Sequence, residues 1–183
     1  MTLNEICDGA ARKLRAWCFA GGAGTAIIEF ALAAPILVVL LLNLFDFSVL
    51  IWSTMQTDYS AQMGAQAAFS LCGGGNPPAL TNCAGLNAAV TTASQSTSLG
   101  TGVTVASGYP GEEFYCVSGT TLQSIGTSPP SPYNCSTATP SNAAATPGDY
   151  IVVQVNYSYT PAFAGLSLAS AQTLTSMARQ RVY

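Results

Sequence analysis

The longest hydrophobic pattern in the chain is a nearly continuous apolar run over residues 25–52. As a helix rising about 1.5 Å per residue, this run is roughly 40 Å long, more than the roughly 30 Å hydrocarbon layer of a bilayer. The pattern therefore predicts one membrane-spanning helix.

Two features interrupt this apolar run. Pro35 cannot donate a hydrogen bond to the carbonyl of Ala31, so we expect a bend in the helix there. A polar line follows one face of the helix at Asn43, Asp46, Ser53 and Thr57, with Leu50 interrupting it. Either this face packs against protein, or a short span ends near Asn43 and continues as a solvated helix.

Helical periodicity continues beyond the apolar run. Tyr59 is followed at every fourth position by Met63, Ala67 and Leu71, which would lie along one side of a helix. This spacing predicts that the helix extends to about Leu71, where three glycines, 73–75, end it. A short second helix is expected over 85–96.

Period-two alternation predicts an antiparallel sheet in the rest of the chain. The clearest strand is 150–159, where Ile151, Val153, Val155, Tyr157 and Tyr159 share a face and Gln154, Asn156 and Ser158 mark the other. Further strands are expected around 103–105 and 114–117, with a weaker one over 170–182. The Pro-, Ser- and Thr-rich residues 119–148 read as a long surface loop. The predicted fold class is α+β, a long N-terminal helix carrying a small antiparallel sheet domain.

The positions of the charged residues predict how the chain is oriented in the membrane. The chain has five basic residues and a net charge of −3, and no basic side chain lies between residues 16 and 178. A nucleic-acid binder needs several Lys or Arg side chains to neutralise phosphates, so that class is excluded. Arg12, Lys13 and Arg15 precede the apolar run, and the positive-inside rule therefore predicts a cytoplasmic N-terminus and an extracytoplasmic remainder.

A removable secretory signal peptide is the alternative for the N-terminal region. Its apolar core would be about 7 to 15 residues long, shorter than the run observed here. The small-residue sequence "ALAA" is followed by Pro35, a poor residue at a peptidase site, and most of the run lies beyond it. A retained helix is therefore the favoured interpretation.

Four cysteines lie after the membrane helix, in what should be an oxidising compartment, and they allow three pairings. We predict Cys72–Cys83 and Cys116–Cys135, because each bridge closes a short loop rich in Gly, Pro, Asn and Ser. Loops of this size gain on the order of 3 kcal/mol in the chain-entropy model.

Candidate catalytic and metal-ligating groups are scarce. The chain has no histidine and no C-x-x-C pair, so we expect no metal site and no cofactor. After residue 58 the carboxylates are Glu112, Glu113 and Asp149, and adjacent glutamates on a strand face opposite ways. We therefore expect no catalytic residues and no enzymatic activity.

The stretch "GTAIIEFALAAP" resembles the processing and assembly motif of tight-adherence (Tad) type IV pilins, most closely TadE-like minor pilins or pseudopilins. The motif residues are Gly24, a tetrad at 25–28, Glu29, Phe30 and Pro35. "YSAQMGAQAAFSLC" and "DYIVVQVNYSYTPAFAG" are also similar to family segments. Gln62 and Gln66 stand where arginines are common, which weakens any ionic role for that stretch.

The resemblance implies that a prepilin peptidase cuts between Gly24 and Thr25, after glycines that disfavour helix by about 1 kcal/mol each. Glu29 would then be fifth from a new amino terminus and would pair with the free amine of a neighbouring subunit. The alternative role for Glu29 is a carboxylate at the helix start, favoured by the helix dipole.

These expectations divide the chain into a cytoplasmic leader (1–24), a transmembrane part (25–52), an extracytoplasmic continuation of the helix (53–72) and a disulfide-containing domain (73–183). The implied function is a minor pilin of the bacterial inner membrane that joins a pilus used for adhesion and biofilm formation. Its implied partners are the prepilin peptidase, other pilins and Tad assembly proteins. The alternative is an unprocessed single-pass envelope protein that scaffolds another complex.

Overall fold

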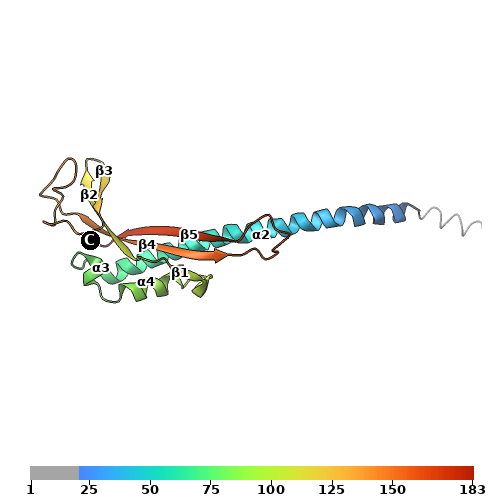
Figure 1. Cartoon of the computed structure of the whole chain (residues 1–183), viewed down its shortest axis with the longest axis horizontal. Coiled ribbons are helices and arrows are strands. Elements are labelled where there is room, and N and C mark those ends of the chain that lie inside the picture. Colours follow the sequence, from blue (N-terminus) through green and yellow to red (C-terminus); the bar gives the residue numbers. More distant parts are fainter. Residues whose placement is uncertain (1–20) are drawn as a thin grey trace, which may run out of the picture.

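The computed structural model describes residues 21–183, with side chains from residue 27 onward. The molecule is elongated (Figure 1). One helix, α2 (Gly21–Cys72), runs along most of its length. The first half of α2 extends away from the domain, and α4, β4 and β5 pack along its second half. The predicted α+β class with a long N-terminal helix is confirmed.

The domain follows α2 in the chain and contains short helices and five strands. Its elements are α3 (Ala79–Asn82), α4 (Leu86–Ser94), the 3-10 helix η1 (Gly100–Gly102), β1 (Val103–Val105), β2 (Gly111–Ser118), β3 (Thr121–Gly126), β4 (Gly148–Tyr159) and β5 (Gln172–Arg181). The second helix and the predicted strands are therefore present, including the weak last one.

All strand pairs are antiparallel, and β4 is the central strand. One edge of β4 pairs first with β2 and then with β1, and β2 pairs in turn with β3. The other edge pairs with β5 over ten residues, from Tyr150 opposite Arg181 to Tyr159 opposite Gln172. The apolar face of β4 that alternation predicted is buried at Ile151, Val153, Val155 and Tyr159.

The core lies between this sheet, α4 and a buried row of small and polar residues on α2. The buried row consists of Asn43, Asp46, Ser53, Thr57, Ser60, Ala61, Gly64, Ala65, Ala68 and Cys72. These positions recur at intervals of three, four or seven residues, with Ser60 and Ala61, and Gly64 and Ala65, as adjacent pairs, so they form one face of the helix. Of the two interpretations of the polar line, packing against protein is confirmed, and the protein concerned is the chain's own domain.

The helix α2 ends where the sequence pattern predicted. The face that packs against the domain, however, is not the row of Tyr59, Met63, Ala67 and Leu71 on which that prediction was based. The helix ends at Cys72, yet Tyr59 is 51% exposed and Leu71 is 49% exposed. Small residues pack inward because they let the helix approach α4 closely. A Cβ added at Gly64 would overlap the hydroxyl of Ser94.

The prediction of one long loop over 119–148 is wrong at its start, because β3 pairs with β2 there. The remainder forms a small second cluster around Cys116, Cys135 and Ala138. The backbone of this segment is held by Cys135, whose N–H donates to Ala145 O at 2.9 Å and whose carbonyl accepts from Asn142 N at 3.0 Å.

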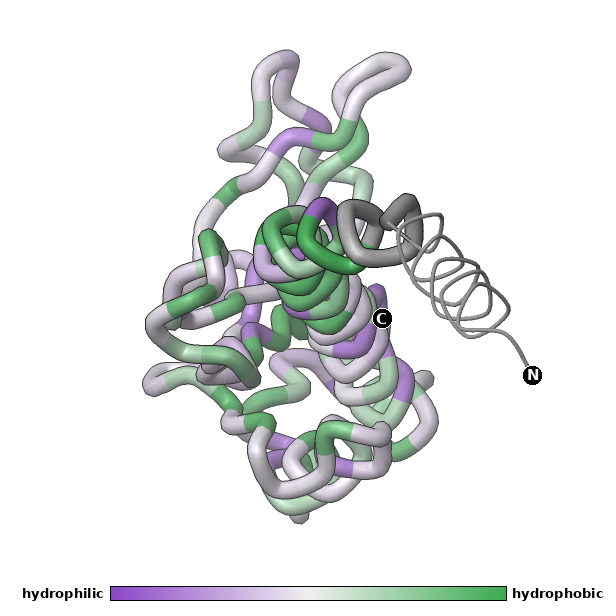
Figure 2. Tube along the Cα trace, turned by 90° about the vertical axis from the view of Figure 1, so that its right-hand side faces the viewer, coloured by the Kyte–Doolittle hydropathy of each residue, from purple (hydrophilic) through white to green (hydrophobic). Residues whose placement is uncertain are grey.

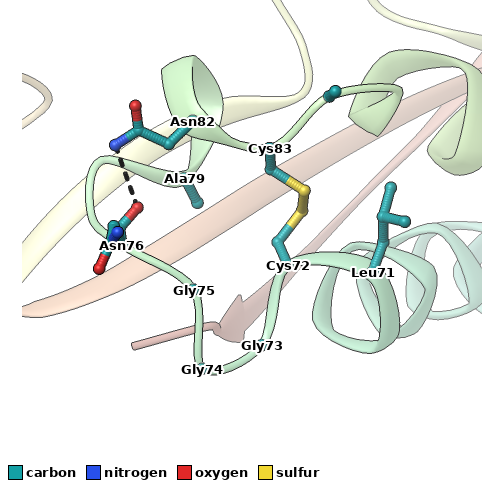
Figure 3. Close-up of a pocket in the computed structure, with 10 residues that line it drawn as sticks. Leu71, Cys72, Gly73, Gly74, Gly75, Asn76, Ala79, Asn82 and Cys83 are labelled. Atoms are coloured by element: carbon teal, nitrogen blue, oxygen red, sulfur yellow. Dashed lines mark hydrogen bonds between the residues drawn. A yellow bond between two sulfur atoms is a disulfide. The ribbon is translucent and has the colours of Figure 1, made fainter.

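Both predicted disulfides, Cys72–Cys83 and Cys116–Cys135, are present. Figure 3 shows the first bridge joining the end of α2 to the segment after α3. Between them the chain turns through Gly73–Gly75, and Gly74 adopts φ +78°, a conformation that favours glycine. The bridge closes a turn that begins where α2 ends.

Candidate functional site

The motif residues lie on the first described turns of α2. The described part of α2 starts at Gly21, so Gly24 and Thr25 are helical, which differs from the poorly helical stretch expected there. The rest of the predicted leader lies outside the described residues. Pro35 lies inside a continuous helix, and the bend expected there stays a prediction.

The side chains beyond the predicted cut site are uncovered. Glu29 is exposed, and Phe30 beside it is 72% exposed. Within the described part of the chain, Glu29 makes no hydrogen bond or ion pair with the domain. The carboxylate is therefore available to a group from outside residues 27–183.

The first half of α2 has the surface of a membrane span. Among the described helices, α2 has an 18-residue window of mean hydropathy 2.5, of which 6% is buried. A core helix of a soluble domain would be mostly buried. In Figure 2, seen from the N-terminal end of α2, the near turns of the helix are predominantly hydrophobic.

The polar residues of the buried row hold the β4–β5 loop, residues 160–171, against the helix. Asn43 Oδ1 accepts from Leu168 N at 2.6 Å, and its Nδ2 donates to Leu166 O at 3.1 Å. Asp46 Oδ1 accepts from Ala162 N at 3.0 Å. Sequence reasoning found the polar line but not its partner, because a contact between positions more than 110 residues apart leaves no local pattern.

A second polar group lies at the other end of the domain, where two buried carboxylates hold the start of α3. Asp149 Oδ2 accepts from Ala79 N at 2.9 Å, and Glu112 Oε1 accepts from Leu80 N at 3.0 Å. Burial, with a smaller contribution from the neighbouring Asp149 charge, raises the pKa of Glu112 to about 7. Burial also raises the pKa of Asp149. A protonated Glu112 can therefore donate to Asp149 Oδ1, which has no other partner among the described residues.

Glu113 faces the opposite side of β2, as alternation predicted. Its Oε2 accepts from the Tyr115 hydroxyl at 2.6 Å and from Arg179 Nε at 3.1 Å. These bonds, the one from Tyr115 first, lower the pKa of Glu113. These bonds connect β2 to β5 across β4, so the role of Glu113 is structural.

Other candidate ligand sites are weak. Among residues 21–183, no group of three or more His, Cys, Asp or Glu side chains is placed to hold a metal ion. A pocket of about 400 Å³ beside the Cys72–Cys83 bridge is lined by uncharged residues, including Asn76 and Asn82, which are joined by a hydrogen bond (Figure 3).

Comparison with known proteins covers the N-terminal half of α2 and its continuation. Residues 24–66 match the family model described as TadE-like protein, a match that begins at the predicted cut site and includes Glu29, Phe30 and Pro35. Neither the search of curated proteins nor the search of solved structures found a match. Over residues 24–66, the motif and the helix that carries it are therefore similar to TadE-like proteins.

Proposed function

We propose that the protein is a minor pilin, or pseudopilin, of a Tad-type pilus, processed by a prepilin peptidase between Gly24 and Thr25. The observation that carries the proposal is the family match starting at Gly24 on a helix whose first half is apolar and uncovered. A subunit of this form is stored in the membrane by its helix and joins a pilus through the same helix. Surface adhesion and biofilm formation are the functions that such a pilus would serve.

The proposed coupling group is Glu29. It is exposed among apolar neighbours, with Ile28 62% and Phe30 72% exposed. A carboxylate in such surroundings is costly to leave unpaired, and an amine of a neighbouring subunit would relieve that cost. Cleavage would create that amine at Thr25. The same chemistry could not operate with the leader attached.

The proposed location is the bacterial inner membrane, with the N-terminus cytoplasmic and the domain periplasmic before assembly. A single apolar helix fits a membrane-anchored single-pass protein, and the orientation rests on the basic residues before the helix. The proposed partners are the prepilin peptidase, other pilins and the Tad inner-membrane assembly proteins. No enzymatic role is proposed.

The first prediction concerns processing. Intact mass of the mature protein from cells with an active prepilin peptidase should correspond to a chain beginning at Thr25. Gly24→Trp should block this cut, because the peptidase site needs a small residue at the end of the leader. A native chain that retains Arg12 and Cys18 in such cells would refute the minor-pilin proposal.

The second prediction concerns assembly. Glu29→Ala should be cleaved like the native chain but should reduce pilus assembly strongly, because the neighbour's amine loses its partner. Asp58→Ala is the matched control, since Asp58 is an exposed carboxylate on the same helix, and it should assemble normally. Normal piliation of Glu29→Ala cells would remove the coupling role.

One observation favours a second candidate function, an unprocessed single-pass envelope protein. The Gly24–Thr25 bond lies within α2, and a peptidase must unwind a helix to reach its backbone. The glycines lower the cost of unwinding by about 1 kcal/mol each relative to alanine. The mass measurement above distinguishes the two functions directly.

A further inference from the structure

The β4–β5 loop has an unusual combination of exposed apolar side chains and no charge. Leu168 is 82% exposed, Leu166 56% and Phe163 37%. None of residues 160–171 carries a charged side chain. An uncharged loop with bulky apolar side chains on its surface is poorly suited to water.

The loop is seated on α2 near the end of its uncovered apolar half. Asn43 and Asp46 bind its backbone, and the Phe163 ring packs edge-on against Phe45 with centroids 5.9 Å apart. Figure 1 shows the loop beside α2 at the end of the domain from which the bare part of the helix emerges. The exposed apolar surface of the helix and that of the loop are therefore continuous.

Helix length places this contact at the edge of a bilayer. The rise from Ile27 to Asp46 is about 28 Å, close to the roughly 30 Å thickness of a hydrocarbon layer. A layer that begins near Ile27 therefore ends near Asp46. The helix carries no charged side chain between Phe30 and Phe45, so nothing in this stretch opposes immersion.

The hydrogen bonding also suits an apolar environment, where unsatisfied backbone groups cost several kcal/mol. Asn43 satisfies Leu168 N and Leu166 O, and Asp46 satisfies Ala162 N. Within the loop, Leu166 N and Ser167 N donate to Phe163 O at 3.0 and 3.1 Å. In return the loop covers Asn43 and Asp46, which are 7% and 0% exposed.

We propose that the β4–β5 loop is a second membrane contact, with Leu166 and Leu168 immersed in lipid at the outer edge of the layer that α2 spans. The occupant of this surface is lipid acyl chain, reached because the loop is fixed to the helix at that depth. The inference rests on α2 as a membrane span and is independent of leader cleavage and pilus assembly.

Tryptophan reporters in lipid vesicles test the depth of the loop. In the full chain with Trp17→Phe and Trp52→Phe, Leu168→Trp is compared with Leu122→Trp in phosphatidylcholine vesicles with brominated acyl chains. Leu122 is a matched control because it is an exposed leucine, 57%, on β3 at the far end of the domain. Leu168→Trp should emit at shorter wavelength and lose most of its fluorescence to the brominated lipid, while Leu122→Trp should do neither.

Two additions make every outcome informative. Val38→Trp, in the bare half of α2, reports the span itself and should be quenched. Quenching of Val38→Trp without quenching at position 168 overturns the loop proposal while leaving the span intact, and quenching of neither overturns both. A blue-shifted Leu168→Trp that resists brominated lipid would mean that a second protein copy covers the loop. If Leu168→Trp fails to form both disulfides, Leu166→Trp replaces it with the same expected result.

Discussion

The adjacent carboxylates Glu112 and Glu113 have opposite acid–base behaviour because β2 turns them to opposite faces. Glu112 is buried against Asp149, and burial raises its pKa to about 7. Glu113 accepts from Tyr115 and Arg179, and these bonds lower its pKa. One strand therefore carries two pH responses of opposite sign.

The third prediction follows from Glu112. In an unfolded chain its pKa is near 4.5, so the folded domain binds more protons between that pH and about 7. Stability from this group is therefore highest in acid and is lost as the pH rises to about 7, on the order of 3 kcal/mol in all. Glu112→Gln should flatten this slope and raise the unfolding free energy at pH 8, because an amide can donate to Asp149 Oδ1 without charge.

Denaturant unfolding of the membrane-reconstituted protein between pH 4 and 8 measures the effect. The control is Glu113→Gln, which should change stability with the opposite sign. Glu113 has a lowered pKa, so its contribution is present at neutral pH and is lost as the pH falls below about 4.5. An unchanged slope above pH 4.5 in Glu112→Gln would contradict the assignment.

At the scale of elements, the central feature is close packing of α2 on α4 through small residues. Gly64 permits this approach, because a Cβ there would overlap Ser94 Oγ and approach Val153 Cγ1 to 3.1 Å. The Ser94 hydroxyl is buried without a hydrogen-bond partner in the described structure. The close contact therefore depends on the absence of a side chain at Gly64, and it leaves the Ser94 hydroxyl without a hydrogen bond.

The fourth prediction is a double-mutant cycle at this contact. Gly64→Ala should lower the unfolding free energy, since overpacking costs about 1–3 kcal/mol and the helix propensity of alanine returns only about 1 kcal/mol. In a Ser94→Ala background the same change should become neutral or stabilising, because the hydroxyl no longer stands in its way. Equal effects in both backgrounds would show that Ser94 does not limit the packing. Gln62→Ala, on the exposed side of α2, serves as the control.

Elements with strong local periodicity could be predicted from sequence, and those shaped by distant contacts could not. The apolar run of α2 and the alternation of β4 are local signals. In β5 the half-buried positions include Ser176 and Gln180, so its alternation is poor although the strand pairs with β4 along its whole length. The strand β3 was missed because it is mostly exposed and lies in a polar, proline-rich segment.

The same distinction holds for the site. The motif from Gly24 to Pro35 is contiguous, so sequence alone could suggest it, and its cleavage and coupling roles stay predictions. The two disulfides, which the structure contains, followed from short separations. The role of Asn43 and Asp46 required the fold, since their partners lie in the β4–β5 loop. The approach of Glu112 to Asp149 likewise depends on strand register, which sequence did not specify.

At the scale of the whole molecule, residues 21–183 form two cores, each with its own disulfide. Cys72 belongs to the large cluster formed by α2, α4 and β4, against which Cys83 packs. Cys116 and Cys135 form the centre of the small distal cluster. The two bridges should therefore protect different parts of the protein.

The fifth prediction separates the two bridges by hydrogen exchange. Cys116→Ala/Cys135→Ala should speed exchange in residues 127–147 and leave α4 and β4 protected. Cys72→Ala/Cys83→Ala should instead weaken the large core, with a loss on the order of 3 kcal/mol in the unfolding free energy. The same exchange pattern in both variants would mean that the domain opens as one unit.

The buried row on α2 also has a mechanical consequence. It joins helix and sheet from Asn43 to Cys72, so no hinge separates the membrane-spanning half of α2 from the domain packed on its second half. A sideways force on the distal β2–β3 hairpin is therefore transmitted as torque through the packed half of α2 to its membrane-spanning half. The angle at which the domain stands above the membrane is set by the tilt of α2 within it.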